Sequence, residues 1–180
     1  NNWEDAKMLS PKKIASFKGN WETIQPSKSD DLKRFYGWFP YILKASEPGS
    51  SFSFKFEGNA FGLFDIGGPE VGQLEIELDG KSLRFKKQRK ATYIQSKDLT
   101  SDYLMNRFNK YCNNRYRGQY FVMKVNPGKH HVKIFISENK SDKIKILSKN
   151  QLTDIHEFPE KYNKTEVLLG KILIKGKILK

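Results

Sequence analysis

The sequence is poor in the residues that cross-link small domains or hold metal clusters. Its 180 residues include one cysteine, Cys112, which excludes an intrachain disulfide and a cysteine-based metal cluster. No apolar run approaches the ~20 residues that a membrane-spanning helix needs. The chain must therefore depend on an ordinary hydrophobic core, and a chain of this length can bury roughly 70% of its unfolded surface.

Motifs for nucleophilic catalysis and phosphate binding are missing too. The sequence contains no G-x-S-x-G elbow, no Gly-Asp-Ser block and no G-x-G-x-x-G loop before a helix. Glu75 and Glu77 alternate along a predicted strand, a pattern typical of an exposed sheet face. Asp154 and His156 are the only acid–histidine pair whose spacing points to hydrolysis. We predict no catalytic residue and keep a stand-alone hydrolase as an alternative function.

Sustained helical periodicity is absent, and strand patterns take its place. Apolar residues alternate over 52–56 and 74–78, and residues 60–66 form a continuous apolar run. Glu57-Gly58-Asn59 is predicted to be a turn between the first two of these strands. Asp79-Gly80 predicts a type I′ hairpin, which needs positive φ at both central residues.

Turn signals at short intervals divide the remainder of the chain into further short strands. Pro40 favours an edge strand over 41–44 rather than a central one, and Pro127-Gly128 predicts a turn between two late strands. The further strands are predicted over 14–17, 21–24, 82–85, 91–94, 118–125, 131–137 and 167–174. This pattern predicts an all-β fold, a β-sandwich of the jelly-roll type.

Two parts of the chain do not fit the strand pattern. Residues 1–13 are polar and predict a linker or N-terminal extension, so that 14–180 form a single β-sandwich domain. Residues 96–117 predict one long irregular or short-helical insertion, because Tyr103, Arg107 and Tyr111 recur at helical spacing.

The formal charge of +13 and the pI near 9.7 suit anionic partners. The densest cluster, residues 81–90, has six cations and no acid. It fits either a solvated strand edge or a polyanion-binding surface, and the second is an alternative function. Lysine greatly outnumbers arginine along the chain, which argues against nucleic acid as a partner.

Aromatic and acidic residues in two loops are the first candidates for ligand binding. Residues 34–45 have the densest aromatic content, and Tyr36 and Trp38 are candidate platforms for a sugar ring. Asp65 and Glu70 frame a Gly-Gly-Pro turn at a strand end. A carboxylate there caps backbone amides, accepts from sugar hydroxyls or holds a structural Ca²⁺; no other cofactor is predicted.

The segment 106–120 supplies the remaining candidates. It places Arg107, Arg115 and Arg117 among tyrosines, together with Asn109 and further asparagines. Aromatic rings stack on the apolar face of a pyranose, while amide and guanidinium groups pair with its hydroxyls or a carboxylate. The same residues also suit a buried polar network that pins the insertion to the sheet.

Several segments resemble the β-sandwich module attached to bacterial SGNH/GDSL-type esterases. The resemblance runs from Ile14 to Leu179 and is carried by RFYGWFP, FEGNAFGLFDIGGPEVGQLEIELDG, NRFNKYCNNRYRGQYFVMKVNPGKHHVKIFIS and EVLLGKILIKGKIL. GGPEVGQ and NNRYRGQY are its most specific parts. The hydrolase half of that family, with its serine motif and catalytic histidine, has no match in this sequence.

The resemblance implies a galactose-binding-like jelly roll beside a hydrolase domain that removes acyl groups from carbohydrate. It implies a non-catalytic accessory module, secreted, periplasmic or at the cell surface of a bacterium. Its partners would be carbohydrate or the covalently attached hydrolase domain, whose active site it would help to shape.

Overall fold

The computed structural model describes residues 4–90 and 92–180. Strands hold 49% of the chain and helices 17%, so the predicted all-β class is confirmed. Three long strands of 13 to 20 residues form the centre of the fold: β5 (Ser51–Gly67), β11 (Arg117–Ile136) and β12 (Val167–Leu179). The shorter strands are β1 (Ala6–Leu9), β2 (Ser16–Lys18), β3 (Glu22–Ile24), β4 (Ile42–Ala45), β6 (Gln73–Leu78), β7 (Lys81–Ser82), β8 (Arg84–Lys87), β9 (Thr92–Ser96) and β10 (Leu104–Asn106).

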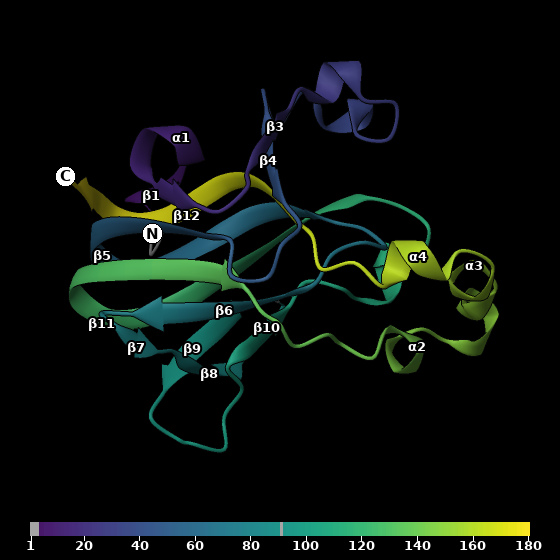
Figure 1. Cartoon of the computed structure of the whole chain (residues 1–180). Coiled ribbons are helices and arrows are strands. Elements are labelled where there is room, and N and C mark those ends of the chain that lie inside the picture. The colour runs from purple at the N-terminus through teal and green to yellow at the C-terminus, as the bar shows by residue number, and fades with distance from the viewer. Residues whose placement is uncertain (1–3, 91) are drawn as a thin grey trace.

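The strands form one hydrogen-bonded network that folds into two packed layers. Its central order is β10-β6-β11-β5-β12-β4-β3, and the long strands curve through the molecule (Figure 1). The first half of β5 and the second half of β11 pair with β2 and β6, and we call this layer A. The other halves pair with β12 and β9, and with β1, β3, β4 and β8 they form layer B.

The pattern of inward-facing residues along β5 shows where this strand passes from one layer to the other. Phe52, Phe54 and Phe56 point inward from layer A, whereas Phe61 and Leu63 point inward from layer B. The inward positions switch from even to odd between these groups. Because side chains alternate strictly along a regular strand, an irregularity must lie between them, and the pairing of β5 with β11 shifts there, between Lys124 and Gly128.

Two predicted turns are therefore wrong. Residues 57–59 and Pro127-Gly128 do not reverse the chain; each lies within a single bent strand, β5 or β11. The two strands pair with one another from Arg117↔Gly67 to Phe135↔Ser51. Since the partner strand follows the same bend, both strands pass from one layer to the other without a hairpin.

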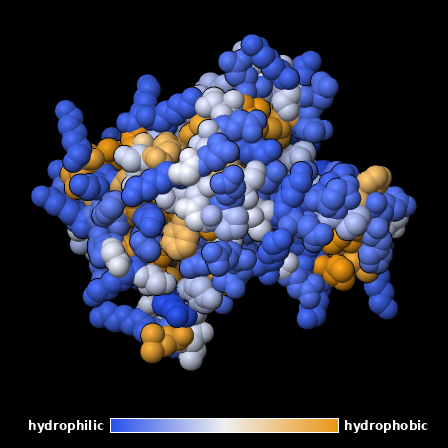
Figure 2. All heavy atoms as spheres, in the orientation of Figure 1, coloured by the Kyte–Doolittle hydropathy of each residue, from blue (hydrophilic) through white to orange (hydrophobic). Residues whose placement is uncertain are grey.

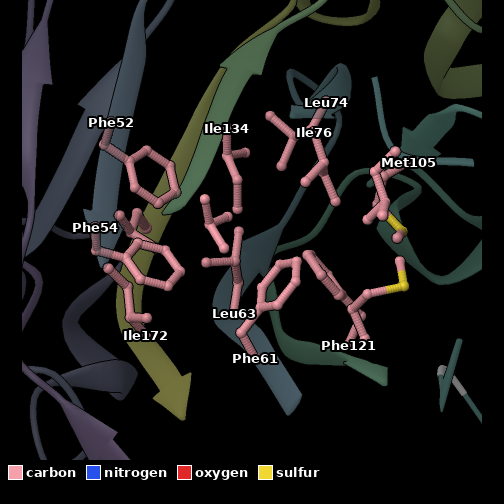
Figure 3. Close-up of a cluster of buried hydrophobic side chains, with 14 of the residues drawn as sticks. Phe52, Phe54, Phe61, Leu63, Leu74, Ile76, Met105, Phe121, Ile134 and Ile172 are labelled. Carbon is pink, nitrogen blue, oxygen red and sulfur yellow. The ribbon is translucent and has the colours of Figure 1, made fainter. Parts of the chain in front are cut away.

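The core lies between the two layers (Figure 3). Inward residues of β5, β6, β11 and β12 meet there, and Phe56, Leu63, Phe121, Ile134 and Ile172 are fully buried. A second cluster forms on the other face of layer B, where Phe39 and Ile42 pack against Ile66 and Leu168. The side of the molecule seen in Figure 2 is mostly hydrophilic, in keeping with the net charge of +13.

The predicted Asp79-Gly80 hairpin is confirmed. Leu78 pairs with Lys81, and both turn residues have positive φ, 53° at Asp79 and 79° at Gly80. The Asp79 carboxylate also accepts a hydrogen bond from the backbone N–H of His131. Burial opposes ionisation of Asp79, but the bonds and charges of His131 and His130 outweigh it and lower its pKa.

Two segments near the start of the chain differ from expectation. Within the predicted 1–13 linker, residues 6–9 form β1 and pair with β12, and Pro11–Ile14 form the short helix α1; residues 1–3 lie outside the described part. The 41–44 segment, predicted to be an edge, corresponds to β4, which lies between β12 and β3.

Short helices gather at one end of the sandwich, away from the C-terminus (Figure 1). They are α2 (Lys143–Ile146), α3 (Leu152–Glu157) and α4 (Pro159–Tyr162), and we call residues 138–165 the helical lobe. The insertion over 96–117 is irregular as predicted, with only β10 and a 3₁₀ turn at Lys110–Cys112. In the described residues no helix is long and apolar enough to cross a membrane.

Candidate functional site

A buried ion pair closes the end of the core nearest the 106–120 segment. Asp65 continues the inward row of β5, and Arg107 follows β10. Arg107 Nε lies 2.9 Å from Asp65 Oδ2, and Nη2 lies 2.6 Å from Oδ1. The exposed fractions are 1% for Asp65 and 6% for Arg107. Although burial opposes its charge, the adjacent carboxylate raises the pKa of Arg107 above its ordinary value.

Gln119 and Asn109 extend this pair into a polar network. Gln119 Nε2 donates to Asp65 Oδ2 at 3.2 Å and to the Arg107 carbonyl at 2.9 Å, while its Oε1 accepts from Asn109 Nδ2 at 3.0 Å. The Asn109 side chain also accepts from the Tyr111 N–H. The network ties the insertion to β5 and β11, so it holds the loop that carries the next two arginines.

An exposed tryptophan and three arginines meet above this network. The residues line an open pocket of about 400 Å³, and we call them the Trp38–arginine site: Arg34, Phe35, Trp38, Arg115, Tyr116, Arg117 and Gly118. Half of the chain's six arginines are in this set, and none of its members is acidic. The site therefore has the electrostatics of an anion-binding surface.

Trp38 is held by aromatic packing on the outer face of layer B. Its ring lies 5.9 Å from that of Phe64 and 6.2 Å from that of Phe35, yet 60% of the residue is exposed. Gly118 makes this possible, because a Cβ added there would lie 3.0 Å from Trp38 Cζ3 and 3.1 Å from Phe64 Cε2. The glycine lets the indole lie against the strand while more than half of the residue stays exposed.

Tyr111 contacts two of the arginines, Arg115 and Arg117. The Arg117 guanidinium lies 4.6 Å from the centre of the Tyr111 ring, and Arg115 Nε donates to the Tyr111 carbonyl at 3.2 Å. These contacts restrain both side chains but leave most guanidinium N–H groups available. Such groups pair in a forked geometry with a carboxylate or with adjacent hydroxyls.

Glu70 lies behind the site rather than on its surface. It is 9% exposed, and its Oε2 has no hydrogen-bond partner in the described residues. Tyr116 lies between Glu70 and the pocket, against Gly68. Burial raises the pKa of the Tyr116 hydroxyl well above its ordinary range, and the charge of Glu70 adds to this shift.

Lys143 lies at the Gly-Gly-Pro turn, where the sequence suggested a structural Ca²⁺. Lys143 Nζ donates to the Pro69 carbonyl at 2.7 Å and lies 5.0 Å from the Phe108 ring. Both Asp65 oxygens bond to Arg107. In the described residues no group of three or more acidic, histidine or cysteine side chains could hold a metal ion.

The predicted site residues thus separate into three places. Trp38, Arg115 and Arg117 line one surface pocket. Asp65 and Arg107 bond to each other, and Asn109 joins them through Gln119. Glu70 is buried behind Tyr116. Tyr36, 62% exposed, is close to Trp38 in sequence but does not line the pocket. The prediction missed Arg34, Tyr116, Gly118 and Gln119, although Arg34 begins the aromatic RFYGWFP segment.

The acid–histidine pair of the hydrolase alternative does not meet. Asp154 and His156 lie two residues apart on α3, where side chains point in different directions. Asp154 instead accepts a hydrogen bond from the Tyr162 hydroxyl. Residues 154 and 156 therefore do not form a catalytic pair in this arrangement.

No protein-family model matches the sequence, and no curated protein matches it. Solved structures match at low identity. A GH87 α-1,3-glucanase catalytic domain in complex with tetrasaccharides is 14% identical, with a TM-score of 0.49 over 96% of this chain and 28% of that chain. A family two carbohydrate esterase from Cellvibrio japonicus is 14% identical, with a TM-score of 0.45 over 97% of this chain and 35% of that chain.

A third match is a domain of similar size. The CBM36-1 domain of a multidomain xylanase from the hindgut metagenome of Trinervitermes trinervoides is 8% identical, with a TM-score of 0.46 over 95% of this chain and 97% of that chain. This chain therefore spans only about a third of the esterase and less of the glucanase.

Proposed function

We propose that this chain is a non-catalytic carbohydrate-binding module that uses the Trp38–arginine site. The exposed face of Trp38 stacks on the apolar face of a sugar ring. Arg115 and Arg117, restrained by Tyr111, donate to hydroxyls or to a carboxylate of the same sugar. The observation that carries the proposal is that one exposed tryptophan and three arginines line the same pocket, whose described lining has no acid.

The buried network has a positioning role in this proposal. Asp65, Arg107 and Asn109 do not contact the sugar; they hold the insertion, so that the 115–118 loop keeps its place beside Trp38. Glu70 acts in a similar way from behind Tyr116. This assigns a supporting role to half of the residues that the sequence suggested as ligand contacts.

The resemblance to the accessory modules of SGNH/GDSL-type esterases supplies the wider context of the proposal. In that context the module belongs to a secreted, periplasmic or cell-surface bacterial protein, and a covalently attached hydrolase domain acts on acylated carbohydrate. The adjoining coding sequence tests this part, because a Gly-Asp-Ser block in the same reading frame is required.

Substitution of Trp38 tests the binding site directly. We expect Trp38→Ala to weaken binding of a responsive oligosaccharide about tenfold, or ~1.4 kcal/mol, because the stacking surface is lost. The measurement is calorimetric titration with a panel of neutral and uronate-bearing oligosaccharides. Lys55→Ala is the control, since Lys55 is an exposed cation on the outer face of layer A.

Two results contradict the proposal. One is that no oligosaccharide of the panel binds to the unmodified chain. The other is that Trp38→Ala and Lys55→Ala bind the responsive oligosaccharide equally well, which places binding elsewhere. Hydrolysis of an acetyl ester by the isolated chain, lost in His156→Ala, would favour the hydrolase alternative instead.

A further inference from the structure

A larger groove lies on the same outer face of layer B. It has a volume of about 760 Å³ and is bordered by β1 on one side and by the turn between β8 and β9 on the other. Its floor is largely apolar and includes Phe64, Tyr120, Val122, Met8 and Leu173. Arg89 and Lys90 are at its β8–β9 border. We call it the outer groove.

The outer groove continues directly from the Trp38–arginine site. Gly118 lines that site, and Tyr120 and Val122 follow on the same face of β11 and line the groove. Phe64 is opposite Tyr120 in the pairing of β5 with β11, and its ring also contacts Trp38. From Gly118 to Val122 the strand advances about 13 Å, so the combined surface is longer than a single monosaccharide.

The outer groove is positively charged, like the Trp38–arginine site next to it. Its lining residues include Arg89, Lys90 and Lys7, and none of the described lining residues is acidic. Within the described residues, Arg89 and Lys90 have no ion-pair partner. They come from the basic 81–90 cluster, in which two other members have partners: Arg84 bonds to the Leu99 and Ser101 carbonyls, and Lys86 pairs with Asp98.

The apolar floor favours a sugar polymer over a nucleic acid strand. Stacking of successive bases needs successive aromatic platforms. Tyr120 is 52% exposed, but the floor beyond it is aliphatic, with Val122, Met8 and Leu173. Aliphatic side chains suit the C–H faces of pyranose rings, and the cationic border suits carboxylates carried by those rings.

From this geometry we infer that the ligand is a linear carboxylated polysaccharide, a polyuronate chain. It runs from the Trp38–arginine site across Phe64 and Tyr120 to Arg89 and Lys90. The inference rests on the proposed function and adds to it the length and charge of the ligand. In this inference two of the six cations of the basic 81–90 cluster, Arg89 and Lys90, bind carboxylates of the ligand.

Oligogalacturonates of increasing length test the inference by calorimetric titration. For the unmodified chain we expect affinity to rise with length until the oligomer spans the groove. The double variant Arg89→Glu, Lys90→Glu should weaken binding of the hexamer at least about tenfold and leave the dimer unchanged, because two charge-assisted contacts are lost. Tyr120→Ala should have the same selectivity. Lys55→Glu, Lys129→Glu is the control, because it reverses two exposed charges in other strand segments.

The outcomes separate the inference from the proposed function. If the hexamer binds the groove variants as tightly as the unmodified chain, the inference fails while binding at Trp38 stands. If neither dimer nor hexamer binds, but a neutral oligosaccharide binds and is lost in Trp38→Ala, the polyuronate is excluded. If no oligosaccharide binds, both fail. Tighter binding of an oligothymidylate of equal charge, with a steep salt dependence, would assign the groove to nucleic acid.

Discussion

Single residues decide how the Trp38–arginine site is held. The sequence grouped Asp65, Arg107 and Trp38 as ligand contacts because all three residue types suit a sugar. The structure separates them by burial: Asp65 is 1% exposed and Trp38 is 60% exposed. Residue type predicts the chemistry that a side chain can perform, whereas burial determines whether a ligand can reach it.

The Asp65–Arg107 pair gives the first prediction at this scale. Asp65→Ala leaves Arg107 buried without a counter-charge, and we expect a loss of about 3–5 kcal/mol in the free energy of unfolding. The double variant Asp65→Leu, Arg107→Leu should lose less than Asp65→Ala, because no unpaired charge remains. Urea unfolding measures both; a double variant less stable than the single variant would contradict this account.

Gly118 gives the second prediction. In Gly118→Ala the new methyl group meets the Trp38 and Phe64 rings at about 3 Å, so these rings must shift away from the strand. We expect weaker oligosaccharide binding, by about tenfold, with little change in stability. The control is Gly128→Ala, where the nearest atom to an added Cβ is 3.7 Å away. Equal oligosaccharide binding by both variants would show that binding does not depend on the packing of Trp38 against Gly118.

At the scale of elements, the sequence predicted strands better than it predicted their connections. Alternation identified the strands near 52–56, 74–78 and 131–137, because burial on one face imposes a period of two, and a continuous apolar run identified the strand near 60–66. It could not distinguish a turn from a bend at Gly58 or Pro127-Gly128. That difference depends on the partner strand, which curves alongside, and residues next to one another in sequence do not specify it.

The helical lobe is also an element whose attachment only the structure reveals. Lys143 is 7% exposed and donates to the Pro69 and Lys164 carbonyls. Gln151 Nε2 donates to the Lys110 carbonyl, and the Tyr162 hydroxyl accepts from the Asn114 N–H. These contacts join the lobe to the loop after β5 and to the insertion that holds Arg115 and Arg117.

Lys143 predicts a pH dependence of stability. Burial lowers the pKa of its ammonium group to about 8, although the charge of Glu70 opposes this shift. The folded state therefore binds fewer protons than the unfolded state between pH 8 and the ordinary lysine pKa of about 10.4, and stability should rise across that interval. Burial raises the pKa of the Cys112 thiol, which opposes this rise above the ordinary thiol pKa of about 8.5, and the raised pKa values of Tyr116 and Tyr162 reverse the trend above their ordinary pKa of about 10.

Urea unfolding at pH 7.5, 8.5 and 9.5 measures this effect. The unmodified chain should gain stability over this range, and Lys143→Met should gain less. Lys145→Met is the matched control, because Lys145 is on the same helix with an exposed side chain. The same slope in all three proteins would mean that Lys143 is not the titrating group.

At the scale of the whole molecule, the net charge of +13 has a consequence for stability. Like charges repel more strongly in the compact state than in the expanded unfolded chain. Added salt screens this repulsion, since the Debye length falls from about 30 Å at 0.01 M to about 10 Å at 0.1 M. We expect the urea midpoint to rise over that range of sodium chloride. A falling midpoint would indicate that the ion pairs outweigh the repulsion.

The all-β class, most strand positions and the Asp79-Gly80 hairpin could be predicted from the sequence, because each follows from local periodicity or from backbone requirements of two or three residues. The two segments that supply the site could be predicted as well. Which of their residues are exposed, and that β5 and β11 bend rather than turn, became clear only from the folded chain. Only it placed Arg89 and Lys90 on the same face as Trp38. These properties arise from contacts between residues far apart in sequence, whose position is set by packing.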